Sequence, residues 1–189
     1  MVDAYSSQIE NAKKTLRVID QTASMHFTLS DTYKRYSKFE DILEILISVI
    51  LCGLTFLDYE KYFGLPANTS ILLVGFLSIF LFAYTLIKQA LGHKELYERH
   101  LLAGKMYVKI KRELRTKIKR WESGEVEDIL GVLDNLTGAL EDLIQIPEKK
   151  FAKLKHQHQA KVAFSKFLDD NPHKFWLVCR WKFRMKNKK

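Results

Sequence analysis

The chain has 189 residues with 31 Lys and Arg against 22 Asp and Glu, a formal net charge of +9, and 47% hydrophobic residues at a mean hydropathy of −0.16. This length fits one domain. The two cysteines, Cys52 and Cys179, exclude a disulfide framework or a cysteine-ligated metal centre, because they fall in different predicted environments. Alternating strand patterns are nearly absent, which predicts an all-α fold.

Residues 1–41 are predicted to form an N-terminal cytoplasmic amphipathic helix. Six basic and six acidic side chains balance in this segment, and no signal peptide is expected there. Its apolar positions recur at intervals of three and four, which is the seam of a helix that packs on partners. His26 lies on this seam, and we interpret it as a packed or capping polar residue rather than a ligand. The seam consists of Ile9, Ala12, Leu16, Ile19, Ala23, His26 and Tyr33.

Two apolar runs, Ile42–Leu57 and Ile71–Ile87, interrupt the charged chain. At 1.5 Å per residue each would span about 25 Å, close to the ~30 Å hydrocarbon core of a bilayer. Neither run has the polar face that a soluble hairpin turns to water. We therefore expect residues 42–91 to form a hairpin of two transmembrane helices rather than the core of a soluble bundle. Aromatic residues extend this contact into the interfaces: Phe39, Tyr59, Tyr62 and Phe63.

The distribution of basic residues predicts the orientation of the hairpin. The connecting loop Asp58–Ser70 carries one lysine against two acidic residues, whereas basic residues flank both runs on their other sides. The positive-inside rule therefore predicts a multi-pass membrane protein whose N and C termini are both cytoplasmic. The flanking basic residues are Lys34, Arg35, Lys38, Lys88, Lys94, Arg99 and Lys105.

Polar residues recur about once per helical turn along the first run, and more weakly along the second. In lipid, such a stripe is tolerated where it meets another helix or lines water. Two interpretations remain open: hydrogen-bonded packing within the hairpin, or the lining of a pore. One hairpin cannot enclose a pore, so the second interpretation requires a homo-oligomer. The candidate pore-lining residues are Glu44, Ser48, Cys52, Thr55, Ser78 and Thr85.

Residues 92–121 are predicted to continue the second span without a break as a basic stalk helix. Ten basic and three acidic side chains surround a narrow apolar seam, which suits association with copies of itself or with the N-terminal helix. The seam comprises Ala103, Tyr107, Ile110, Leu114, Ile118 and Trp121. The candidate ligand-binding residues on this helix are Lys105, Lys109, Arg112 and Arg115.

Residues 122–189 are predicted to form a C-terminal helical extension. Residues 122–146 contain seven acidic and no basic side chains, and we expect one helix from an N-cap at Ser123 to the break at Pro147. Another helix is expected over Glu148–Leu168, before the turn signal at residues 169–172. The expected apolar face of the acidic helix is Val126, Ile129, Leu133, Leu136, Leu140 and Leu143.

The tail after residue 172 is basic and rich in aromatic residues, and three interpretations of it remain open. It could pack against the acidic helix of its own or a neighbouring subunit. It could bind a nucleotide or oligonucleotide, with phosphates on Lys and Arg and bases stacked on aromatic rings. It could also bind anionic lipid headgroups. The candidate ligand-binding residues are Arg180, Trp181, Lys182 and Arg184.

No signal for catalysis is found in the sequence. It contains no glycine-rich phosphate loop, no nucleophile motif and no paired-carboxylate signature. His156 and His158 are two residues apart on a predicted helix, so they point in different directions and make poor metal co-ligands. We therefore predict that the protein is not an enzyme and uses no metal or other cofactor.

Residues 1–121 resemble the SLATT family of bacterial two-transmembrane effectors. The resemblance rests on a long N-terminal helix, two close spans and a charged helix with the sequence HKELYERHLLAGKMYVKIKREL at 93–114. The positions that look similar to the family pattern are His93, His100, Ala103, Tyr107 and Glu113.

This resemblance implies an oligomeric effector of antiphage defence that breaches the bacterial inner membrane when a sensor partner signals infection. The expected signal is a nucleotide or oligonucleotide made by a partner nucleotidyltransferase, as in Hailong-type systems, where it is a DNA oligomer. Residues 122–189 fall outside the shared part, which is where a system-specific sensor is expected. The alternative is a non-conducting membrane adaptor, or a lipid-binding scaffold anchored by the hairpin.

Overall fold

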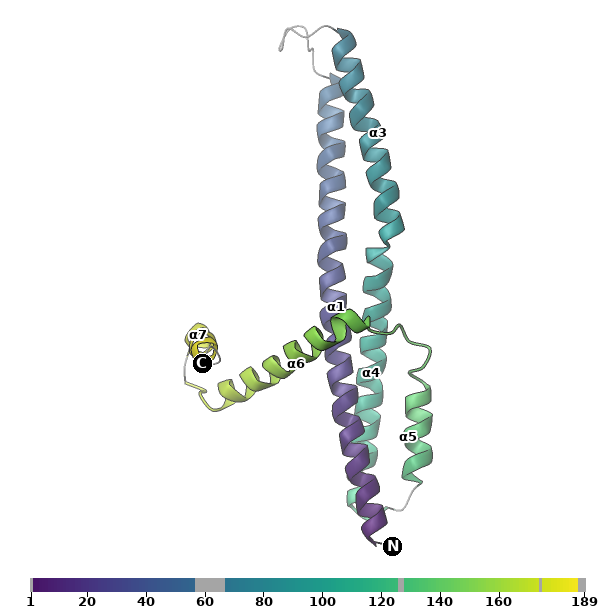
Figure 1. Ribbon diagram of the computed structural model, residues 1–189, viewed down its shortest axis with the longest axis vertical. Helices are drawn as coiled ribbons and strands as arrows, with labels where there is room; N and C mark the ends of the chain where they lie inside the picture. Colours follow the sequence, from purple (N-terminus) through teal and green to yellow (C-terminus); the bar gives the residue numbers. More distant parts are fainter. Residues whose placement is uncertain (1, 57–66, 126–127, 174, 187–189) are drawn as a thin grey trace. The chain divides into compact units, whose positions relative to one another are not determined.

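The structure, a computed structural model, describes residues 2–56, 67–125, 128–173 and 175–186. Within these ranges every regular element is a helix, so the all-α prediction is confirmed (Figure 1). The chain divides into two compact units, one formed by Met1–Thr28 with His100–Lys189 and the other by Leu29–Arg99. The helices are α1 (Val2–Phe56), α3 (Ala67–Leu91), α4 (His93–Glu122), α5 (Ile129–Gly138), α6 (Glu148–Asp169) and α7 (Trp176–Lys186).

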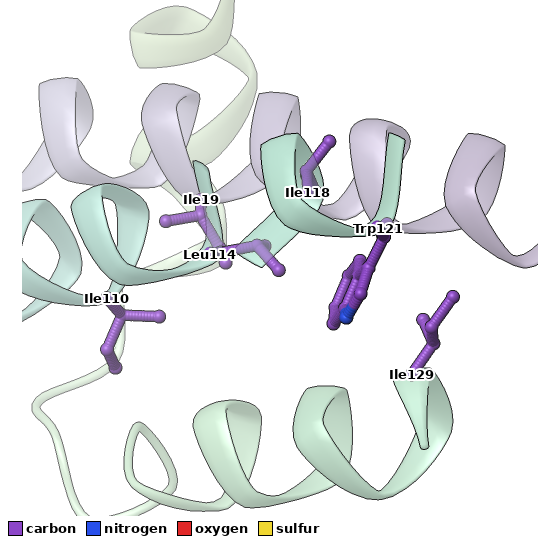
Figure 2. Close-up of a cluster of buried hydrophobic side chains, with 7 residues drawn as sticks. Ile19, Ile110, Leu114, Ile118, Trp121 and Ile129 are labelled. Carbon is purple, nitrogen blue, oxygen red and sulfur yellow. The ribbon is translucent and has the colours of Figure 1, made fainter. Parts of the chain in front are cut away.

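The core of the first unit joins the two apolar seams expected from the sequence. Ala12 and Ile19 of α1 pack with four residues of α4 and with Ile129 of α5 (Figure 2). Trp121 is 1% exposed, and its side chain extends from the end of α4 toward Ile129 of α5. The seam prediction is therefore confirmed, and the partner of the α4 seam is the N-terminal part of α1. The four α4 residues are Ile110, Leu114, Ile118 and Trp121.

The acidic helix is shorter than expected, and its N-cap was predicted wrongly. Asp128 is the N-cap, because its carboxylate accepts a hydrogen bond from the Gly131 backbone N–H at 3.1 Å. Ser123 instead donates its hydroxyl to the carbonyl of Arg120, just beyond the end of α4. The helix ends at Gly138, since glycine is a poor helix former and Thr137 is β-branched. The predicted apolar position Val126 lies outside the described residues.

Helices α6 and α7 pack against each other in the C-terminal part of the first unit. The predicted α6 is confirmed to within one residue at its end. The ring of Phe183 lies 5.2 Å from that of Phe164 and 5.8 Å from that of Phe167, measured between centroids. Cys179 is fully buried, so one face of α7 is turned onto α6.

The second unit contains the apolar parts of α1 and α3, and neither part is buried. No residue of 42–56 or 71–91 is buried within the described structure. One helical stretch in the described residues, Ile71–Glu122, holds a window long and apolar enough to cross a membrane. The end of α1 does not meet the same criterion, because residues 39–56 include Glu40, Asp41 and Glu44. The second span is thus matched by α3, whereas the two-span hairpin stays a prediction.

We predicted that the second span continues without a break into the stalk helix, and this prediction is wrong at one residue, Gly92. Gly92 has a φ of 59° and separates α3 from α4. This left-handed conformation suits glycine, which has no Cβ to clash with the backbone. The hydrogen bonds continue on both sides, from Gly92 N–H to the carbonyl of Lys88 and from Leu96 N–H to the carbonyl of Gly92. The loop residues 57–66, including Tyr59, Tyr62 and Phe63, lie outside the described residues.

Candidate functional site

A charged cluster ties α1 to α3 in the second unit. The Lys88 ammonium donates to Asp41 Oδ1 and to Glu44 Oε2, both at 2.6 Å. The Thr85 hydroxyl donates to the other oxygen of Glu44 at 3.2 Å. Lys88 is therefore shared by two carboxylates one turn apart on α1, and it neutralises one of their two charges. The side chains are partly shielded from solvent, at 22% exposure for Lys88 and 30% for Glu44.

The same cluster extends to His93 and encloses a cavity. His93 Nδ1 lies 2.6 Å from Glu40 Oε1, and its ring stacks on Tyr33 at 5.9 Å between centroids. A cavity of about 510 Å³ is lined by this cluster together with Gln89, Glu95 and Glu98. Its lining holds more carboxylates than cations, so the site has a cation-attracting potential at the ends of the apolar segments.

The predicted pore residues separate into two groups. The structure brings Glu44 and Thr85 together, as described above. The hydroxyls of the three other Ser and Thr residues donate to backbone carbonyls of their own helix. Ser48 donates to Glu44, Thr55 to Cys52 and Ser78 to Val74, at 2.7–2.8 Å. Ser48, Cys52, Thr55 and Ser78 are all exposed on the second unit. Ser48 and Cys52 line a shallow groove on α1 together with Asp41, Glu44, Ile45 and Val49.

Sequence reasoning missed Asp41, Lys88, Glu40 and His93 as members of one cluster. Lys88 was noted only as a basic residue that flanks the second run, and His93 only as part of the family pattern, whereas Asp41 was not singled out. The signal that could have found them is the spacing of Glu40, Asp41 and Glu44 around the start of the first run, together with Lys88 directly after the second run. Lone charges at the ends of apolar helices in a hairpin need a partner, and the hairpin brings those ends together.

The four predicted ligand residues of α4 form a basic face in the first unit. Lys105, Lys109, Arg112 and Arg115 are exposed and lie opposite the buried seam of the same helix. Among the described residues none of the four is in an ion pair, whereas Lys111, on a flank of α4, binds Asp20. The exposed Lys119 and Arg120 continue this surface toward the end of α4. We call these six residues the α4 basic face.

The predicted ligand residues of α7 lie on a separate helix. Arg180 is exposed, and its guanidinium lies over the Trp176 ring at 5.1 Å from the centroid. Trp181 is 63% exposed. The side chains of Lys182 and Arg184 lie outside the described residues. The α7 candidates therefore lie on a different helix from the α4 basic face.

A buried histidine pair lies in the first unit. His26 Nδ1 and His100 Nδ1 are 3.0 Å apart, and both residues are 1% exposed. Tyr107 stacks on His26 at 5.3 Å between ring centroids. Burial and the neighbouring His100 lower the pKa of His26 to about 4, and burial with the charge of Lys150 lowers the pKa of His100. The two rings are therefore neutral at pH 7, one donating and the other accepting, and His26 is packed as predicted.

This pair predicts acid sensitivity of the first unit. The pKa of His26 is lower in the folded than in the unfolded chain. The contribution of the neutral His26 to the free energy of unfolding is therefore complete above about pH 6.5 and is lost as the pH falls toward 4. We expect the loss to be on the order of 1–2 kcal/mol by pH 5. Thermal unfolding followed by circular dichroism between pH 7.5 and 5 measures it. His26→Gln should flatten the profile, whereas His156→Gln, at an exposed position, should leave it unchanged; equal profiles for both variants would contradict the assignment.

No group of three or more His, Cys, Asp or Glu in the described ranges is arranged to hold a metal ion. Comparison with known proteins finds no matching family model, no matching curated protein and no matching solved structure.

Proposed function

We propose that this protein is an oligomeric, channel-like effector of the bacterial inner membrane in antiphage defence, gated by a nucleotide or oligonucleotide bound to its basic cytoplasmic helices. The proposal joins the resemblance to SLATT effectors with one observation on the second unit. The apolar segments 42–56 and 71–91 contain no buried residue, and α1 carries exposed polar residues along a groove that includes Glu44, Ser48 and Cys52.

The exposure of these helices supports a membrane location. Large side chains along α3 are mostly exposed, among them Phe76 at 70% and Phe82 at 66%. In water this surface would be strongly unfavourable, at about 25 cal/mol for each Å² of apolar area. In a bilayer the same side chains contact acyl chains without penalty. Both segments are helical, and a helix pairs the N–H and C=O groups of its interior within itself, as the hydrocarbon core requires.

The polar stripe supports an oligomer. Ser48 and Cys52 are exposed and line the groove that also includes Asp41 and Glu44, and Thr55 is exposed further along α1. A polar stripe with carboxylates at its end is unfavourable against lipid, and it is accommodated where subunits meet or where water fills a central path. We place this stripe toward the oligomer axis and the phenylalanines of α3 toward lipid. The carboxylates at the end of the path would favour cations.

The α4 basic face supports a polyanionic signal. Its side chains are exposed and carry no intramolecular ion pair among the described residues, so they are available to phosphates. A signal gates the assembly only if it binds the open and closed arrangements with different affinity. An oligonucleotide that bridges the α4 faces of neighbouring subunits would satisfy this condition. A nucleotidyltransferase is the expected source of the signal.

Membrane depolarisation tests the proposed function. Expression of the wild-type chain in bacteria, with the signal supplied, should dissipate the membrane potential and arrest growth, measured with a potential-sensitive dye and by viable counts. Ser48→Leu with Thr55→Leu replaces the polar stripe by an apolar one and should abolish depolarisation at equal membrane abundance. The matched control is Ile42→Leu with Ile50→Leu, which changes exposed apolar positions of the same helix that do not line the groove.

The outcomes separate the channel from the alternative adaptor. If the membrane potential persists at high expression with the signal present, conduction is refuted and a non-conducting adaptor is supported. Depolarisation that survives the double leucine substitution would show that the polar stripe does not line the path.

A further inference from the structure

The outer face of α7 is apolar although it is exposed. The helix packs on α6 through Phe183, and Cys179 is buried. Four other side chains are 43–63% exposed and recur at intervals of one, three and four residues, which places them on one stripe. A helix on the surface of a water-soluble unit turns a polar face outward, so this stripe needs a second apolar environment. The stripe consists of Leu177, Val178, Trp181 and Met185.

The positive charge around the stripe indicates which kind of apolar environment the stripe contacts. After Asp170 the chain contains seven Lys and Arg and no Asp or Glu. The exposed Arg180 lies on the same helix as the stripe. An apolar stripe with tryptophan and flanking cations is the composition of a helix that lies in the plane of an anionic membrane surface.

The geometry is less suited to nucleic acid. A base stacks on a free aromatic face. The guanidinium of Arg180 already covers the Trp176 ring at 5.1 Å. The exposed residues that share the stripe with Trp181 are aliphatic or thioether side chains, which offer acyl chains a contact but give bases no stacking platform. The same chain contains α3, a helix apolar enough to cross a bilayer. A helix anchored in the bilayer would hold the rest of the chain near the membrane, so the effective concentration of lipid around α7 would be high.

We propose that α7 is an interfacial helix that binds the anionic cytoplasmic leaflet, with Leu177, Trp181 and Met185 toward the acyl chains and the basic residues at the headgroups. This role goes beyond the proposed channel activity and does not depend on conduction. It assigns the polyanionic signal to the α4 basic face and the lipid surface to α7.

Acyl-chain quenching of Trp181 tests this proposal. The full chain is reconstituted in nanodiscs of dioleoylphosphatidylcholine, with or without dioleoylphosphatidylglycerol, each with and without acyl-brominated lipid. The emission of Trp181 is the difference between wild type and Trp181→Phe. We expect bromolipid to reduce this emission roughly twofold or more in the anionic discs, and less in the neutral ones. High salt should weaken the effect.

Charge reversal supplies the matched variants. Arg180→Glu with Arg184→Glu should remove the quenching in anionic discs. Lys149→Glu with Lys153→Glu makes the same change of charge on exposed positions of α6 and should leave it intact. Circular dichroism checks that both variants are folded, and Leu177→Asn with Met185→Asn tests the apolar contact without a change of charge.

Three results would overturn the proposal. Trp181 could remain accessible to acrylamide in both kinds of disc, which would show an unoccupied face. It could be shielded from acrylamide yet unquenched by bromolipid, which would show contact with a second copy. A short single-stranded DNA could shield Trp181 equally in lipid-free micelles, which would make α7 a nucleic-acid surface.

Discussion

Replacement of Trp121 by alanine is expected to destabilise the first unit by about 3–5 kcal/mol, the range for a buried aromatic residue. Trp121, near the end of α4, is 1% exposed, and its side chain extends toward Ile129 of α5. Its loss would leave a cavity at the point where the core reaches α5, and the ten-residue α5 is too short to be stable without that contact. Thermal unfolding in a non-ionic detergent, followed by circular dichroism at 222 nm, measures the loss.

Trp181→Ala is the matched control, because it removes the same side chain from an exposed position. It should change the stability of the detergent-solubilised protein by no more than about 0.5 kcal/mol. Similar shifts for the two variants would show that the core in Figure 2 does not hold the first unit together.

Charge reversal on α4 is expected to weaken the binding of a short single-stranded DNA by about 100-fold or more at low salt, since each lost phosphate contact also removes counterion release. The variant is Lys105→Glu with Lys109→Glu, both exposed and opposite the buried seam. The slope of log K against log salt should decrease in magnitude by about 0.7 for each lost contact. Fluorescence anisotropy of labelled DNA over a salt series measures both quantities.

Arg180→Glu with Arg184→Glu provides the comparison for this experiment. If α4 binds the signal and α7 binds lipid, the α7 variant should keep most of its DNA affinity in detergent. Loss of binding in the α7 variant alone would contradict the assignment to α4. DNA binding that is equally weak in the wild type and in both variants would remove the polyanionic signal from the proposed function.

Helix periodicity predicted the core of the first unit. The intervals of three and four that include Ala12 and Ile19 on α1, and Ile110 and Leu114 on α4, place these residues on single faces, and the structure buries them together. Local periodicity is reliable here because both seams are long and their flanks are polar. It left open whether the α4 seam meets α1 or another copy of the chain, since a seam of this kind fits either partner.

Helix ends were predicted less well. Ser123 and Asp128 are both good N-cap residues, and the structure uses Asp128, next to Ile129, which joins the core cluster that contains Trp121. Gly92 lies in a sequence with no proline, and a single glycine is tolerated inside helices, so nothing local indicates its positive φ. The choice depends on contacts that a short sequence window does not contain.

By itself, then, the sequence determined that the protein is all-helical, where the apolar and charged segments lie, and which faces of α1 and α4 are buried. These follow from composition and from the 3.6-residue period. Only the tertiary structure decided that Lys88 is shared by Asp41 and Glu44, that His26 faces His100 across 74 residues, and that α7 keeps an apolar stripe exposed while its other face packs on α6. The reason is physical: a periodicity defines the face of one helix, whereas the pairing of two faces depends on which helices come together.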